Sequence, residues 1–185
     1  MILIFLLSFL SSMIITPMAK WLAFKFKVLD YPSQRKIHGR PIPLLGGEVI
    51  YLALAITFLI MAPEKDLLWK EMLVGLLFVG FGFIDDGLWK MKARNKIWMH
   101  LFFSLIFILI TGITFKFVNT EWINLIITLG FITFMANSMN MLDGMDGLVS
   151  GLTFLISGFM AVLAWNNGQD NIMLISTALM GATLG

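Results

Sequence analysis

Long stretches without any charged side chain are the feature that most constrains this chain. Residues 1–19 carry no charge, and six further apolar runs follow, separated by short polar segments. An α-helix needs roughly 20 apolar residues to cross the hydrocarbon core of a bilayer. Because backbone polar groups in lipid must be satisfied inside the segment, runs of this kind predict membrane-spanning helices.

The composition supports this interpretation. Hydrophobic residues make up 59% of the 185 residues and charged residues 13%, whereas soluble domains are about 45–50% apolar and about 25% charged. The chain has no cysteine, which excludes disulfides, thiolate chemistry and Cys-based zinc sites. The two histidines, His38 and His100, are far apart and show no metal-ligand spacing.

We therefore predict an all-α fold, a polytopic transmembrane helix bundle with about six full spans plus a truncated seventh. The spans are expected at residues 2–24, 46–62, 67–84, 97–117, 122–136, 148–165 and 172–185, all in one domain, residues 1–185. The last run has fourteen residues, which is about 21 Å of helix against a core of about 30 Å. The chain is for this reason expected to be a fragment of a longer membrane protein.

The distribution of basic residues predicts which side of the membrane each loop faces. Spans alternate in direction, so the segments after the first, third and fifth spans share one side. That side carries ten of the thirteen lysines and arginines, and the other side carries Lys65, Lys70 and Lys116. Since basic residues concentrate in cytoplasmic loops, we expect the N-terminus outside and the polar clusters near residues 35–40, 85–96 and 137–148 at the cytoplasmic face.

Two adjacent carboxylates, Asp85 and Asp86, end the third predicted span. Acids at a helix C-terminus oppose the helix dipole, and neighbouring like charges repel unless a cation or a proton relieves them. Mg²⁺ binds through one or two carboxylates plus substrate phosphates, and the lysines that follow, up to Lys96, offer phosphate partners. The alternative is that both acids are ordinary residues of the membrane interface.

Polar side chains recur at every third residue after the fifth predicted span: Asn137, Asn140, Asp143 and Asp146. This spacing keeps them near one face of a helix, and Gly144 lets the backbone approach a ligand closely. Ionisable groups at membrane depth are candidates for a functional site. The alternative is a polar turn that joins two spans.

The basic segment at residues 35–47 has two interpretations: a phosphate-binding site or an anchor that contacts lipid headgroups. Its prolines exclude a regular helix. His38 is interpreted as a hydrogen-bonding loop residue, and His100, at the head of the fourth span, as a packing or interfacial residue. The chain combines carboxylates that can bind a metal ion, basic side chains that can bind phosphates, and membrane spans. This combination indicates chemistry on a phosphorylated lipid.

Three segments resemble the signature segments of one family, the polyprenyl-phosphate N-acetylhexosamine-1-phosphate transferases: residues 35–47, residues 82–86 with the downstream Lys96, and residues 137–148. The similarity covers the whole chain, aligned with the family's N-terminal half. It implies transfer of an N-acetylhexosamine 1-phosphate from a UDP-sugar to undecaprenyl phosphate, at the cytoplasmic face of the bacterial inner membrane. The first segment resembles the UDP-GlcNAc branch more than the MurNAc-pentapeptide branch.

The resemblance also implies roles for individual residues. The expected catalytic acids are Asp85, Asp86, Asp143 and Asp146, and Mg²⁺, with Mn²⁺ as the alternative ion, is expected at Asp85, Asp86 and Asn140. Substrate-binding residues are expected at Arg35, Lys36, His38, Lys96, Asn137, Asn140 and Gly144. The expected partners are undecaprenyl phosphate, a UDP-N-acetylhexosamine and the bilayer, without nucleic acid, and either a second copy of the chain or the family's C-terminal half.

Two departures from the family pattern shape the prediction. The family usually has glutamine four residues after the lysine, where this chain has His100, and its C-terminal half is absent from this sequence. We therefore expect the chain alone to be catalytically incomplete.

The alternative function is a non-catalytic module that binds a lipid phosphate or a nucleotide sugar. A transporter would need polar residues near mid-span, where these spans are almost purely apolar.

Overall fold

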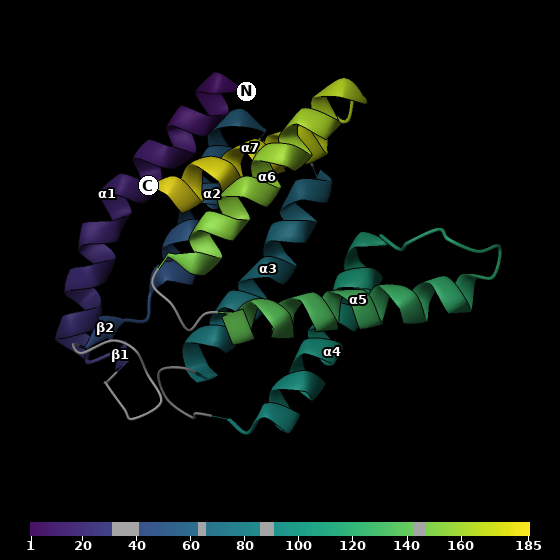
Figure 1. The fold of residues 1–185 in the computed structure, drawn as a ribbon, viewed down its shortest axis with the longest axis horizontal. Coiled ribbons are helices and arrows are strands. Elements are labelled where there is room, and N and C mark those ends of the chain that lie inside the picture. Colours follow the sequence, from purple (N-terminus) through teal and green to yellow (C-terminus); the bar gives the residue numbers. More distant parts are fainter. Residues whose placement is uncertain (31–40, 63–65, 86–90, 143–146) are drawn as a thin grey trace. The chain divides into compact units, whose positions relative to one another are not determined.

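The computed structural model describes residues 1–30, 41–62, 66–85, 91–142 and 147–185, and most of them are α-helical (Figure 1). Within these ranges the elements are α1 (Ile2–Phe26), β1 (Leu29–Asp30), β2 (Ile42–Pro43), α2 (Gly46–Met61), α3 (Asp66–Ile84), α4 (Ala93–Thr111), α5 (Glu121–Leu142), α6 (Leu148–Asn166) and α7 (Asp170–Leu184). Five described helices, α1, α3, α4, α5 and α6, are long and apolar enough to cross a membrane, while α2 and α7 are shorter apolar helices. The predicted all-α, multi-pass membrane fold is confirmed.

Two helix boundaries were predicted wrongly. Helix α4 ends at Thr111 and not near residue 117, because Gly112 takes a left-handed conformation (φ 70°) that closes the helix. Helix α5 continues to Leu142 and does not stop near residue 136. Asn137 and Asn140 are therefore helical residues, and their spacing of three places them on neighbouring turns of one face.

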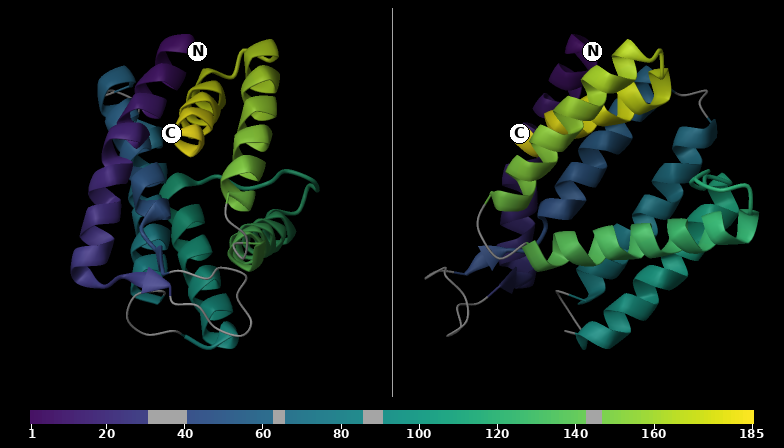
Figure 2. Two further views of the ribbon diagram at one scale, coloured as in Figure 1. Left: turned by 60° about the vertical axis from the view of Figure 1, so that its left-hand side comes forward. Right: turned by 45° about the vertical axis from the view of Figure 1, so that its right-hand side comes forward.

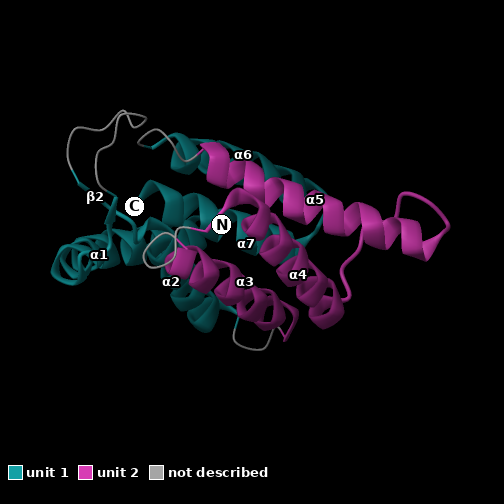
Figure 3. Ribbon diagram, turned by 90° about the horizontal axis from the view of Figure 1, so that it is seen from below, with its two compact units in different colours: residues 1–65, 144–185 teal, residues 66–143 magenta. Residues whose placement is uncertain are grey.

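The chain divides into two compact units, which Figure 3 shows in different colours. One unit consists of Met1–Lys65 and Gly144–Gly185, and the other of Asp66–Asp143. The first holds α1, α2, α6, α7 and the two strands, and the second holds α3, α4 and α5. The assignment of residues 1–185 to one transmembrane domain stays a prediction.

In the first unit, α7 lies between α6 and the α1–α2 pair (Figure 2). Ser8 Oγ donates to the carbonyl of Ala178 (2.6 Å), and Ser12 Oγ donates to the carbonyl of Ala182 (2.8 Å). Both hydrogen bonds join residues 170 positions apart. The constant offset means that α1 and α7 run in the same direction.

Small residues allow α1 and α7 to approach this closely. A Cβ added at Gly181 would collide with the carbonyl oxygen of Phe5 and lie 3.1 Å from the backbone nitrogen of Phe9. Ala178 and Ala182 are buried beside it. Hydrophobic burial does not drive helix association in lipid. The van der Waals packing that such a close backbone approach allows is therefore a main source of attraction between the helices.

A short antiparallel ladder, which the sequence had not predicted, follows α1. Leu29 pairs with Pro43 and Asp30 with Ile42. Helix α1 can end here because Lys27 adopts a left-handed conformation (φ 57°). The ladder joins the two ends of segment 31–40, which lies outside the described residues and contains Arg35, Lys36 and His38.

In the second unit, α4 packs against both α3 and α5. Phe78 and Phe81 of α3 meet the rings of His100 and Phe103 of α4, with ring centroids 5.5 to 6.0 Å apart. Offset and edge-to-face ring contacts at these distances stabilise the pair beyond the area they bury. The α3–α4 contact therefore holds His100 in a fixed place.

Candidate functional site

Asp85 and Lys96 form an ion pair at the point where α3 ends and α4 begins. The Asp85 side chain is almost fully buried, and the residue is 3% exposed. Its Oδ2 contacts Lys96 Nζ, and its Oδ1 accepts the backbone N–H of Met91 at 2.6 Å. A buried carboxylate at a helix C-terminus needs such a cation and donor, because burial and the helix dipole both disfavour its charge.

His100 lies one turn beyond Lys96 on α4 and reaches across to α5. Its imidazole is buried against Phe78 and Phe81 and interacts with the Asn137 side chain of α5. Asn137 Nδ2 in turn donates to the carbonyl of Thr133 at 2.8 Å. The sequence had suggested a packing or interfacial role for His100. The histidine does pack, and it also links the two helices that carry Lys96 and Asn137.

Asn140 lies one turn beyond Asn137 on α5, and its side chain is exposed at the end of the helix. Of the predicted site residues, the structure thus brings Asp85 and Lys96 into direct contact. It places Asn137 beside His100, which was not predicted to belong to the site. The other predicted residues, Arg35, Lys36, His38, Asp86, Asp143, Gly144 and Asp146, lie outside the described residues. Their roles stay predictions.

His100 is the residue that sequence reasoning left out of the site. One signal in the sequence points to it: His100 follows Lys96 by four residues, so the two side chains lie on one helix face. What the sequence lacks is the partner. Asn137 is 37 positions away, and its distance from His100 depends on how α4 and α5 pack.

The donor atoms at this end of the unit suit a hard divalent cation, which prefers carboxylate and amide oxygens. In the described ranges, no group of three His, Asp or Glu side chains lies together in a way that would hold a metal ion. Both oxygens of Asp85 are already engaged, by Lys96 and by Met91. A cation at Asp85 would therefore compete with the Lys96 ammonium.

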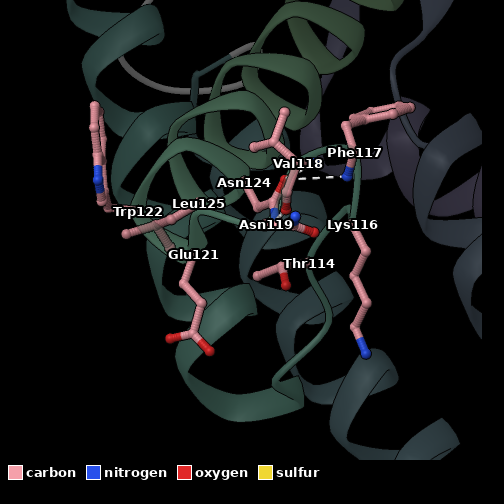
Figure 4. Close-up of a pocket in the computed structure, with 9 residues that line it drawn as sticks. All are labelled: Thr114, Lys116, Phe117, Val118, Asn119, Glu121, Trp122, Asn124 and Leu125. Atoms are coloured by element: carbon pink, nitrogen blue, oxygen red, sulfur yellow. Dashed lines mark hydrogen bonds between the residues drawn. The ribbon is translucent and has the colours of Figure 1, made fainter.

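A hollow of about 670 Å³ lies elsewhere in the second unit. It is formed by the connection between α4 and α5 and by the first turns of α5, with Lys116, Asn119, Glu121 and Trp122 among its lining residues (Figure 4). Asn124 holds this connection: its Oδ1 accepts the N–H groups of Phe117 and Val118, and its Nδ2 donates to the carbonyl of Val118.

None of the predicted site residues that the structure describes lines this hollow. The side chains that line the hollow are mostly exposed. The polar groups of Asn124 are already hydrogen-bonded to the backbone of the connection. We therefore place the candidate site at the other end of α4 and α5, where a buried acid, a lysine and amides gather.

These features define the class: a multi-pass α-helical membrane protein with a charged site at the end of its helices. The sequence pattern of glycosyl transferase family 4 matches residues 68–185, and the chain belongs to this family. The resemblance inferred from residues 35–47, 82–86 and 137–148 is thereby confirmed at the level of the family.

Individual relatives are similar along nearly the whole chain. A probable undecaprenyl-phosphate N-acetylglucosaminyl 1-phosphate transferase of Bacillus subtilis is 29% identical over 191 residues, which cover 98% of this chain and 53% of that protein. A phospho-N-acetylmuramoyl-pentapeptide-transferase of Geobacillus sp. is 32% identical over 213 residues, covering 100% of this chain and 65% of that protein. A transferase of the same description from Bacillus velezensis is 30% identical, and the aligned part covers 63% of it. The chain thus spans about half to two thirds of the length of these relatives.

Proposed function

We propose that this chain forms part of an integral-membrane phosphotransferase that moves an N-acetylhexosamine 1-phosphate from a UDP-sugar to undecaprenyl phosphate. An oxygen of the lipid phosphate attacks the β-phosphorus of the UDP-sugar. The anhydride bond between the two phosphorus atoms breaks, and UMP leaves with the bridging oxygen. The observation that carries the proposal is the buried Asp85–Lys96 pair, which lies within the residues that match the family.

Charge and position explain how these residues would serve the reaction, because phosphoryl transfer needs little beyond alignment and charge neutralisation. Lys96 would neutralise the diphosphate, and Arg35, Lys36 and His38 would bind phosphate groups. Asp143 and Asp146, with Gly144, would contact the nucleotide sugar. Asp85, Asp86 and Asn140 would hold Mg²⁺, which would offset the charge of the phosphates.

The proposed membrane orientation places the Asp85 end in the cytoplasm of a bacterial inner membrane, because the lysines and arginines concentrate on that side. The absence of cysteine from the chain allows a direct test. In spheroplasts, a membrane-impermeant maleimide should label the Asn119→Cys variant and leave the Lys92→Cys variant unlabelled. The reverse pattern would contradict the orientation.

A transfer assay tests the function. Because the chain alone is expected to be catalytically incomplete, membranes carry it together with the C-terminal half of the Bacillus subtilis relative. They receive undecaprenyl phosphate and UDP-GlcNAc labelled with ³²P in the β-phosphate, and are compared with membranes that carry either part alone. We expect label in the lipid fraction, release of unlabelled UMP, loss of product with EDTA and recovery with Mg²⁺. Asp85→Asn and Lys96→Met should remove product, while the matched control Glu121→Gln, at the other end of α5, should retain it.

Two other results have distinct meanings. Saturable binding of UDP-GlcNAc without product would favour the non-catalytic binding module over the enzyme. Neither binding nor product with UDP-GlcNAc or with UDP-MurNAc-pentapeptide would contradict both. The relatives are named for different sugars, so the two donors are tested side by side.

A further inference from the structure

We propose that His100 is a positioning residue: through Asn137 it fixes the register of α4 on α5, and so brings Lys96 level with Asn140. The inference rests on the proposed function for what the site does, but the helix register can be measured without any reaction. It also assigns Asn137 to the support of the site and not to contact with the substrate.

Two polar contacts define the register of these helices. Ser104 Oγ lies 3.3 Å from Thr133 Oγ1, and one turn nearer the polar end the Asn137 side chain interacts with the His100 imidazole. Ser104 follows His100 by four residues on α4, whereas Thr133 precedes Asn137 by four residues on α5. This is the relation expected of two antiparallel helices whose contacts repeat once per turn. One turn toward the polar end, the same register brings Lys96 level with residue 141, beside Asn140.

Each contact is also braced on its own helix. Ser104 Oγ donates to the carbonyl of His100 at 2.7 Å, and Asn137 Nδ2 donates to the carbonyl of Thr133 at 2.8 Å. The two contacts thus form one connected network of four residues. Polar side chains that bond across helices in this way hold membrane helices together, and a connected network restricts sliding more than a single bond would.

Packing alone does not explain a histidine at position 100. The residue is 8% exposed and lies against Phe78 and Phe81. Its Nδ1 is buried and has no hydrogen-bond partner within the described part of the chain, and an unpaired buried nitrogen costs free energy. Phenylalanine would make the same ring contacts without that cost. The imidazole is accounted for by an interaction that phenylalanine cannot make, the one with the Asn137 side chain.

Two substitutions separate positioning from packing. His100→Phe keeps the ring contacts and loses the hydrogen bond, whereas His100→Gln loses the ring and keeps a polar group that can bond to Asn137. We expect His100→Phe to lower kcat of the transfer reaction about 10- to 100-fold with a smaller change in KM, since small misplacements of catalytic groups have effects of this size. His100→Gln should restore most of kcat. Full activity of the Phe variant with an inactive Gln variant would overturn the proposal.

Disulfide crosslinking measures the register directly, because the chain has no cysteine of its own. Met141→Cys is combined in turn with Ala93→Cys, Ile97→Cys and Leu101→Cys, and the rate of oxidative crosslinking is measured for each pair. In the otherwise unchanged chain, the pair with Ile97→Cys should react fastest. His100→Phe and Asn137→Leu should weaken this preference, and His100→Gln should retain it.

An unchanged crosslinking preference in both His100→Phe and Asn137→Leu would show that the register does not depend on this contact, and would overturn the inference. If the preference changes as expected but the unsubstituted chain, assayed together with the same C-terminal half, transfers no sugar phosphate, the proposed function fails and the register assignment stands. The two failures are therefore distinguishable.

Discussion

The α1–α7 contact and the α4–α5 contact both place polar groups between apolar helices, but they use different atoms. In α1–α7, Ser8 and Ser12 donate to backbone carbonyls of the neighbouring helix. In α4–α5, side chains meet side chains: His100 with Asn137, and Ser104 with Thr133. The first contact depends on how closely two backbones approach, and the second depends on which side chains are present.

This difference indicates different tasks. A contact to a backbone carbonyl tolerates any residue at the accepting position that is small enough, so α1–α7 is built for stability. A contact between two particular side chains fixes one register and excludes others, at the cost of burying groups that need partners. Such a contact is expected beneath a site, where Lys96 and Asn140 must be placed correctly.

The largest expected effect comes from the ion pair of the second unit. Lys96→Met leaves the buried Asp85 carboxylate without its cation, which should lower the free energy of unfolding by about 3–5 kcal/mol. Thermal unfolding of the purified protein in detergent measures this. The double variant Asp85→Asn with Lys96→Met should recover most of the loss in stability and none of the transfer activity. A neutral effect of Lys96→Met would mean that the pair does not stabilise the protein.

The next effect tests the α1–α7 contact. Gly181→Ala places a methyl group against the backbone of Phe5 and Phe9, and such overpacking should cost about 1–3 kcal/mol. Gly151→Ala, in α6 of the same unit, is the matched control, since a Cβ there meets no atom of the described residues within 4 Å. Equal unfolding temperatures for the two variants would show that α1 and α7 do not approach as closely as described.

A smaller effect is expected at the connection between α4 and α5. Asn124→Ala removes three hydrogen bonds to the backbone of Phe117 and Val118. The loss should be about 1 kcal/mol, because these exposed backbone groups can bind water instead. Asn119→Ala, an exposed residue of the same connection, serves as the control. Transfer activity should persist in both variants, and its loss in Asn124→Ala would show that this end also supports the site.

The smallest effect is expected from a single hydroxyl. Ser8→Ala removes the donor to Ala178 and leaves the close backbone approach intact, so the loss should be about 0.6 kcal/mol. Ser11→Ala, on a neighbouring face of α1, should change stability less. A loss with Ser8→Ala that exceeds the loss with Gly181→Ala would reverse the assignment, because the hydrogen bond and not the backbone proximity would then dominate the contact.

Several features of the fold and the site were predictable from the sequence. Uncharged runs of nearly bilayer length identify membrane spans, since no other arrangement satisfies their backbone groups in lipid. The spacing of Asn137 and Asn140 predicted that they share a helix face, and α5 contains both. Asp85 was marked as a site residue because an acid at the end of an apolar run needs an explanation. Lys96 was marked because it follows Asp85 and Asp86 as a phosphate partner and because the family resemblance includes it.

The sequence by itself thus determined the helices, the family and the residue types of the site. Hydrophobicity and local spacing depend only on residues that are close together along the chain. The tertiary structure alone decided the partners. It paired Lys96 with Asp85, set His100 beside Asn137, extended α5 to Leu142 and joined β1 to β2. These facts depend on distances between residues that are separated along the chain, and such distances follow from the packing of whole helices, which hydropathy does not encode.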